Sequence, residues 1–207
     1  MSKKRDILNH YEWRIDPACE SYEVLDWASA ASQHARFEVL ADSVELAGRR
    51  LLDVGCGLGD LWAFLKRRGV EVEYVGVDLL EKMVEAARRR QPDATFVHAD
   101  LFDPAAPCPF AAQSFDVIFC SGIFNLNLGN NLAFLVSAVR RLMAMSRREV
   151  VFNLLHARAE MEAHRYAYYR PDEVLPAIEP LGWDLRVLDE YLPNDFTVIC
   201  TRRSDGH

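Results

Sequence analysis

Three glycines in a short loop are the first feature of this sequence with a chemical consequence. They occur in Leu51-Leu-Asp-Val-Gly-Cys-Gly-Leu-Gly59, where an apolar run ends and a helical pattern begins. Because glycine has no Cβ, Gly55, Gly57 and Gly59 let the backbone turn sharply and approach a ligand closely. At the carboxyl end of a strand in a doubly wound sheet, such a loop lies where ligands bind.

Two carboxylates follow the next two apolar runs. Asp78 ends Tyr74-Val-Gly-Val-Asp78, a place from which a carboxylate can accept the hydroxyl groups of a ribose. Asp100 follows in His98-Ala-Asp-Leu101, where an acid beside an apolar leucine suits the edge of an adenine. Asp60 stands where the dinucleotide fingerprint G-x-G-x-x-G needs its third glycine, so that fingerprint is incomplete. The set predicts nucleoside binding, although a tight turn or a helix cap could explain any single residue.

The segments that must position these residues alternate between apolar runs and helical patterns. Short apolar runs predict strands at 50–54, 74–78, 95–98, 115–120 and 149–153. Helical patterns between them predict helices at 61–68, 81–90 and 132–143. This alternation predicts an α/β fold with a doubly wound, mostly parallel sheet and helices on both of its faces.

The carboxyl-terminal part of the chain has a different pattern. Residues 172–181 predict a helix that Pro176 must kink or shorten. Residues 185–188 and 196–201 predict two strands joined by a turn at Pro193-Asn194-Asp195. Such an antiparallel hairpin would complete a seven-stranded sheet.

The amino-terminal part is helical in character from 22 to 46, with no Gly or Pro in the apolar pattern before Leu46. We therefore expect one domain of 207 residues with three sections. These are an N-terminal helical cover (1–48), a ligand-binding core (49–155) and a substrate-side segment with the C-terminal strands (156–207).

Four motifs in this order and spacing resemble those of the class I S-adenosylmethionine (SAM)-dependent methyltransferases. They are the glycine loop, Gly76-Val-Asp78, Ala99-Asp100-Leu101 and Phe115-Asp-Val-Ile118. The resemblance covers residues 49–155 and implies that the chain is an enzyme with SAM as its cofactor. A sulfonium ligand fits the carboxylates, because it carries a positive charge and no phosphate.

The resemblance also implies roles for individual residues. Gly55, Gly57 and Gly59 would wrap the methionine part of SAM, and Asp53 would order their loop. Asp78 would hold the ribose. The other residues expected at the cofactor are Leu79 and Met83 against the adenine or ribose, Asp100 and Leu101 around the adenine, and Ser121 and Gly122 near the reactive methyl group.

The methyl acceptor is less specified by the sequence. After the fourth strand the chain has Ser121-Gly-Ile-Phe-Asn-Leu-Asn127 in place of the Asp/Asn-Pro-Pro-Tyr type motif, which argues against adenine or glutamine N-methylation. A hydroxyl acceptor needs a general base, whereas an amine or thiol needs little more than a lost proton. Candidate catalytic residues are His156 and Tyr166, and candidate substrate-binding residues are Asn125, Asn153 and Trp13. A capping role for His156 and a packing role for the aromatic residues are the alternatives.

Composition limits the function classes. The net charge is −7, so no general basic field attracts DNA, and the arginine clusters have the character of helix ends. Five scattered cysteines without a Cys-x-x-Cys pair favour reduced thiols, and no metal-ligand spacing is present. No apolar run is long enough for a membrane span, and no secretory signal is recognisable, so we expect a cytoplasmic protein.

Three functions remain open at this point. A methyltransferase for a small molecule is favoured, because little sequence lies outside the core; a protein or RNA substrate would need a basic rim around the pocket. A nicotinamide-dependent oxidoreductase shares the sheet and the acid after the second strand, but Asp60 and the Asp100 motif argue against it. A non-catalytic, SAM-binding subunit is the third. The sequence indicates no oligomeric state.

Overall fold

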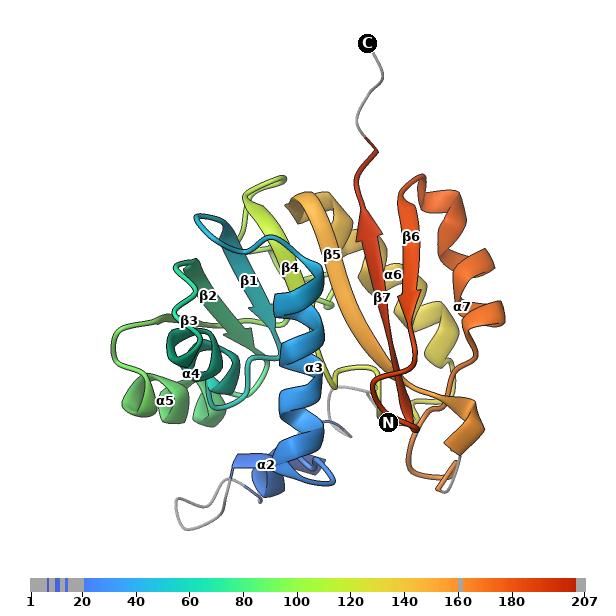
Figure 1. Cartoon of the computed structure of the whole chain (residues 1–207), viewed down its shortest axis with the longest axis horizontal. Helices are drawn as coiled ribbons and strands as arrows, with labels where there is room; N and C mark the ends of the chain where they lie inside the picture. Colours follow the sequence, from blue (N-terminus) through green and yellow to red (C-terminus); the bar gives the residue numbers. More distant parts are fainter. Residues whose placement is uncertain (1–6, 8–9, 12–13, 15–20, 160–161, 204–207) are drawn as a thin grey trace. The chain divides into compact units, whose positions relative to one another are not determined.

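Two compact units, 1–109 and 110–207, make up the chain in the computed structural model. The structure describes residues 7, 10–11, 14, 21–159 and 162–203. Each unit contains part of the α/β architecture drawn in Figure 1. We describe the two units separately, beginning with the one that contains the glycine loop.

The first unit has three parallel strands in the order β3-β2-β1. In the register, Val54 of β1 is level with Val77 of β2, and Asp78 of β2 is level with His98 of β3. The carboxyl ends of the strands, which carry the candidate ligand residues, therefore lie along one edge. The elements of this unit are α2 (Ser21–Val24), α3 (Ala30–Ser43), β1 (Arg50–Val54), α4 (Asp60–Arg67), β2 (Glu73–Asp78), α5 (Glu81–Arg90) and β3 (Thr95–His98).

The helical segment expected at 22–46 is two helices, so that prediction is wrong in one respect. The chain leaves α2 through Asp26, which has a left-handed φ of 60°. It starts again at Ser29, whose side chain accepts a hydrogen bond from the Ser32 amide and caps α3. A hydroxyl that caps a helix competes with the helical hydrogen bonds of the preceding residues, and this explains the break.

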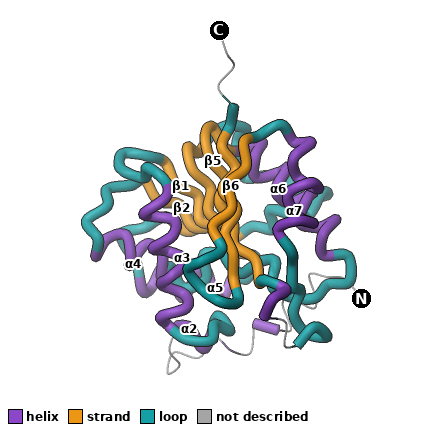
Figure 2. The backbone as a smooth tube through the Cα atoms, turned by 45° about the vertical axis from the view of Figure 1, so that its right-hand side comes forward, coloured by secondary structure: helices purple, strands orange, loops and turns teal. Residues whose placement is uncertain are grey.

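The second unit has four strands in the order β4-β5-β7-β6. β4 and β5 are parallel, whereas β7 is antiparallel to both β5 and β6, as expected for the terminal hairpin. Figures 1 and 2 show α6 and α7 together on one side of β5 and β6. The elements are β4 (Phe115–Cys120), α6 (Asn131–Met145), β5 (Ser146–Leu155), η2 (Ala157–Ala159), α7 (Pro171–Ile178), η3 (Glu179–Leu181), β6 (Asp184–Leu188) and β7 (Asp195–Thr201).

The terminal hairpin differs from expectation at one residue. Asp195 was expected in the turn, but it is the first residue of β7 and pairs with Leu155 of β5. Its side chain is fully buried. A buried acid at the start of an apolar strand is unusual unless it is paired, and its partners are described below.

The described part of the chain has no helix that is long and apolar enough to cross a membrane. Cys56, Cys108, Cys120 and Cys200 form no disulfide with one another; Cys19 lies outside the described residues. Within the same residues, no group of three or more His, Cys, Asp or Glu side chains could hold a metal ion.

Candidate functional site

The glycine loop in the first unit has the backbone conformation that its composition predicts. Gly55, Gly57 and Gly59 have φ values of 74°, 54° and 82°, in the left-handed region that favours glycine. At Gly57 an added Cβ would also lie only 2.7 Å from Cδ2 of Leu25, in the turn after α2. The loop therefore needs glycine both for its turn and for its close contact with the N-terminal cover.

The N–H groups of the loop are largely occupied within the protein. Gly55 and Cys56 donate to the carbonyl of Val77, at 2.8 and 3.1 Å, and Gly59 donates to Cys56 at 3.0 Å. α4, which follows, begins with an acid, Asp60. A pyrophosphate would need free amides and a helix N-terminus without negative charge, so this geometry argues against a dinucleotide site.

Asp60 has a structural explanation that the sequence pattern did not supply. Its Oδ2 accepts hydrogen bonds from the Ser21 hydroxyl and from Nε2 of Gln33, at 3.1 Å in the second case. Ser21 and Gln33 belong to α2 and α3. Asp60, which directly follows the glycine loop, thus links the loop to both N-terminal helices.

Asp78 lies at the end of β2 with its carboxylate against the loop. Oδ2 accepts the Gly57 amide at 3.1 Å, and Oδ1 accepts the Leu80 amide at 2.9 Å. Burial raises the pKa of this carboxyl, while the bonds from Leu80 and Gly57 oppose the rise. Each carboxylate oxygen can accept a further hydrogen bond, so Asp78 retains the capacity to hold two hydroxyl groups.

Asp53 lies on β1, beneath the loop. Its Oδ2 accepts the hydroxyl of Tyr74, on the neighbouring strand β2, at 2.7 Å, and both side chains are buried. Burial raises the pKa of Asp53 to about 7, with the Tyr74 hydrogen bond opposing and the charges of Asp78 and Asp60 adding to the rise. The sequence suggested that Asp53 orders the loop; a buried hydrogen bond between strands is consistent with that role.

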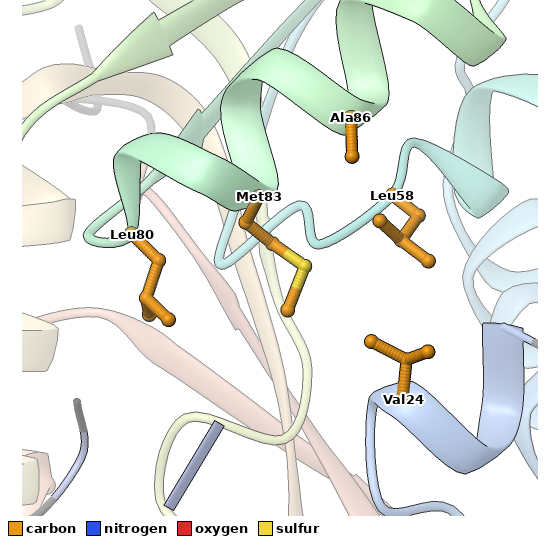
Figure 3. Close-up of a cluster of buried hydrophobic side chains, with 5 residues drawn as sticks. All are labelled: Val24, Leu58, Leu80, Met83 and Ala86. Atoms are coloured by element: carbon orange, nitrogen blue, oxygen red, sulfur yellow. The ribbon is translucent and has the colours of Figure 1, made fainter. Parts of the chain in front are cut away.

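An apolar cluster connects the N-terminal cover to the candidate adenosyl-binding residues (Figure 3). Met83 extends from α5 between Leu80 and Leu58, with Val24 of α2 opposite them. Met83 is 2% exposed, so it packs this cluster in the structure, whereas Leu79 is only partly buried at its edge. Of the two apolar residues expected beside the nucleoside, Leu79 is therefore the more accessible.

Asp100 and Leu101 follow β3. Oδ1 of Asp100 accepts the amides of Phe102 and Asp103, both at 3.1 Å, which closes a turn. Leu101 is 3% exposed. The role of this pair around an adenine stays a prediction, and the turn shows that Asp100 also has a local structural function.

The second unit contains the expected residues that follow β4. Gly122 has a φ of 81°, and its carbonyl accepts the Asn125 amide at 3.3 Å, so the chain turns immediately after the strand. The Asn125 carbonyl accepts the Ala167 amide at 2.8 Å, which joins this turn to the segment after β5. The Ser121 hydroxyl and Oδ1 of Asn125 are buried and have no hydrogen-bond partner in the described chain.

Asn153 on β5 is fully buried, and its amide nitrogen donates to Asp195 of β7 at 3.2 Å. The Tyr191 hydroxyl also donates to Asp195. The sequence suggested Asn153 as a substrate-binding residue but missed Asp195 and Tyr191. The available signal was an acid at the start of the apolar run Phe-Thr-Val-Ile-Cys.

His156 lies beside an open cavity of about 360 Å³. Its Nδ1 accepts the Arg158 amide at 3.1 Å, and partial burial together with the charge of Arg158 lowers its pKa. Neutral His156 must therefore carry its proton on Nε2, which makes Nε2 a donor and not a base. The cavity is lined by His156, Ala157, Arg158, Arg170, Pro171 and Asp172.

Tyr166 is half-buried, with the Arg165 guanidinium 5.0 Å from the centre of its ring. It pairs as an isolated bridge with Leu126, in the segment after β4. A catalytic role for Tyr166 remains a prediction. Trp13, the third candidate for substrate binding, lies outside the described residues.

The residues of the first unit fit an adenosyl ligand without phosphate. Asp78 has acceptor capacity for ribose hydroxyls, Leu79 offers apolar surface, and the occupied loop amides leave no cradle for a pyrophosphate. These properties suit SAM, whose methionine part carries a sulfonium in place of phosphates.

Comparison with known proteins agrees with this fit. A family model described as a methyltransferase domain matches residues 51–145. Trans-aconitate 2-methyltransferase of Afipia carboxidovorans is 32% identical over 108 residues, which are 48% of this chain and 40% of that enzyme. A Mycobacterium tuberculosis protein provisionally named a methyltransferase is 32% identical over 127 residues, 58% of this chain and 71% of that protein. The chain thus spans less than half the length of the Afipia enzyme.

A solved structure extends the likeness to nearly the whole chain. Magnesium protoporphyrin IX methyltransferase from Synechocystis PCC 6803, with bound S-adenosylhomocysteine (SAH), has a TM-score of 0.70 at 15% identity. The match covers 98% of this chain and 100% of that chain, and it confirms the predicted Rossmann-like fold with a mixed sheet of seven strands. From its motifs, its fold and its relatives, the chain belongs to the class I SAM-dependent methyltransferases.

Proposed function

We propose that this chain transfers a methyl group from SAM to a small molecule. The observation that carries the cofactor half of the proposal is Asp78, whose buried carboxylate is held against the glycine loop by Gly57 and Leu80. SAM supplies an activated methyl carbon when it is bound. Asp78 would hold its ribose, Gly55 and Gly57 would approach its methionine part, and the remaining cofactor residues expected from the sequence are Asp53, Gly59, Leu79, Met83, Asp100, Leu101, Ser121 and Gly122.

The proposal of a small-molecule acceptor is supported by the relatives and by the second unit. The names of the Afipia and Synechocystis enzymes specify trans-aconitate and magnesium protoporphyrin IX as their substrates. In this chain, Ser121, Asn125 and Asn153 carry polar oxygen atoms without a described partner after or near the ends of β4 and β5. Buried polar atoms are normally hydrogen-bonded, so this group has the capacity to orient a polar acceptor.

The chain's own residues would contribute mainly by orientation and by exclusion of water. Much of the rate of a displacement at an already activated carbon can come from holding the reacting groups together. His156, as a donor at Nε2, would orient an acceptor and would not deprotonate it. Tyr166 and Trp13 remain candidates for contact with the substrate.

Calorimetric titration with SAM, SAH and NAD tests the cofactor half. We expect both adenosyl ligands to bind and NAD not to bind. Asp78→Ala should weaken SAH binding by about 1.5–3 kcal/mol, the range for hydrogen bonds to a charged group. Asp93→Ala is a matched control, because Asp93 is exposed and bonds only with Trp62 and Lys66 in the contacts described.

Thermal unfolding of each variant shows whether Asp78→Ala still folds. Binding of NAD alone, or equal SAH affinity in the wild type and a folded Asp78→Ala protein, would contradict the assignment. Release of SAH during incubation with SAM and small acceptors then separates an enzyme from a non-catalytic SAM-binding subunit.

A further inference from the structure

A row of buried polar side chains crosses the sheet of the second unit near the carboxyl end of β5. Asn153 of β5 is level with Thr197 of β7, and Asp195 lies two residues before Thr197 on the same face. Asn153 and Asp195 are 0% exposed, and Thr197 is 1% exposed. Polar groups buried this deeply need hydrogen-bond partners, so their partners show which polar atoms remain available to a ligand.

The orientation of Asn153 follows from its contact with Asp195. Its Nδ2 lies 3.2 and 3.4 Å from the two carboxylate oxygens. In this arrangement the amide nitrogen donates to the carboxyl group of Asp195, and Oδ1 of Asn153 takes the other position. Oδ1 of Asn153 is buried and accepts no hydrogen bond from any described residue.

Asp195 is itself held in place. The Tyr191 hydroxyl donates to Oδ1 of Asp195 and lies 2.9 Å from the Thr197 hydroxyl. Tyr191, Asp195 and Asn153 therefore form a chain of hydrogen bonds that ends at the Asn153 oxygen. Such a chain restrains the last group in one orientation, as supporting contacts do in binding sites.

The face of the sheet that carries this row is opposite to α6. Phe152, the neighbour of Asn153, contacts Phe124, which in turn contacts Phe134 of α6. Alternation along the strand places Asn153 on the other face. Cys120 is level with Phe152, so Ser121, which follows it, continues the chain beside Asn153 and adds a second unpartnered oxygen.

We propose that Oδ1 of Asn153 positions the methyl acceptor by accepting a hydrogen bond, and that the acceptor presents an N–H or O–H group to it. This inference rests on the proposed function. Asp195 and Tyr191 are positioning residues, since they act through Asn153. An ionised carboxylate has no hydrogen to donate, so a compound with carboxylates as its only polar groups does not fit this site.

Nuclear magnetic resonance of the full-length protein tests the proposal without knowledge of the substrate. Asn153→Leu identifies the side-chain amide signal of Asn153 by its loss. Phenol and benzylamine are the donor probes and benzoate is the acceptor-only probe, each titrated with and without SAH. We expect at least one donor probe, and not benzoate, to shift the Asn153 signal.

Variants separate positioning from a merely structural role. Tyr191→Phe and Asp195→Asn should weaken binding of the donor probe by about tenfold, the scale of one lost hydrogen bond, while the affinity for SAH stays unchanged. Asp184→Asn, in an exposed pair with Arg203, is the matched control and should change neither.

Three results would overturn the proposal: a shift with benzoate alone, no shift with either donor probe, or unchanged donor affinity in both variants. The titrations without SAH test the donor-binding site independently of cofactor binding, so failure of this proposal can be distinguished from failure of the cofactor assignment. If SAH fails to bind but a donor probe still shifts the Asn153 signal, the methyltransferase proposal fails and the donor-binding site remains.

Discussion

At the scale of single residues, the left-handed backbone at Gly57 allows the effect of a substitution on stability to be predicted. Its φ is 54°, and an added Cβ would lie 2.7 Å from Cδ2 and 3.0 Å from Cδ1 of Leu25. We expect Gly57→Ala to lower the free energy of unfolding by about 1–3 kcal/mol, through backbone strain and through the contact with Leu25. Urea denaturation measures the change.

Two further variants separate the effect of backbone strain from the effect of the contact with Leu25. Gly48 also has a left-handed φ, of 68°, but nothing lies within 4 Å of its added Cβ, so Gly48→Ala should cost only the backbone part. Leu25→Ala in the Gly57→Ala background removes the contact, and the double variant should lose less than the sum of the single variants. Equal losses for Gly48→Ala and Gly57→Ala would show that contact with Leu25 has no effect.

At the scale of elements, the start of α3 depends on a cap that its sequence supplies. The Ser29 hydroxyl accepts the Ser32 amide at 3.1 Å, and the Ser32 hydroxyl accepts the Ser29 amide at 3.3 Å. Ser29→Ala should lower the free energy of unfolding by about 1 kcal/mol, the usual cost of losing an N-cap. Asn130→Ala is the control, because Asn130 precedes α6 without a side-chain cap. A similar loss for both variants in thermal unfolding would argue against the cap.

Elements that depend on local sequence were predictable, and those that depend on distant partners were not. β1 and α5 begin and end where the apolar run and the helical pattern predict; Gly55 follows the end of β1, and Pro92 lies two residues after the end of α5. The break after α2 depends on the left-handed Asp26 and on the Ser29 cap, and neither residue interrupts the apolar pattern of the sequence. The helical pattern therefore located the helical region correctly but predicted one continuous helix where the structure has two.

The residues of the candidate site also fall into those predictable from local sequence and those that depend on distant partners. The glycine loop and Asp78 were predictable because their function depends on positions next to strand ends, which a sequence motif records. Asp195 was assigned to a turn because its hydrogen-bond partner, Asn153, lies 42 residues away along the chain. Only the pairing of β5 with β7 brings the two together.

At the scale of the whole molecule, two buried acids on the strands of the first unit affect how stability depends on pH. Burial raises the pKa of Asp53 to about 7 and also raises the pKa of Asp78. In the unfolded chain an aspartate has a pKa of about 3.9. Between about pH 4 and pH 7 the native state therefore keeps a proton on Asp53 that the unfolded chain has lost.

The sign of the effect follows from this difference. Because the native state binds the additional proton, raising the pH across this window favours the unfolded chain, and the contribution of Asp53 to stability falls until about pH 7. Asp53→Asn has no proton to lose and still accepts the Tyr74 hydroxyl, so its free energy of unfolding should decline less over the same window. Urea denaturation at intervals from pH 4.5 to pH 8 compares the two proteins. Parallel curves would mean that Asp53 is ionised in the native state throughout, and that Tyr74 stabilises its charge more strongly than burial opposes it.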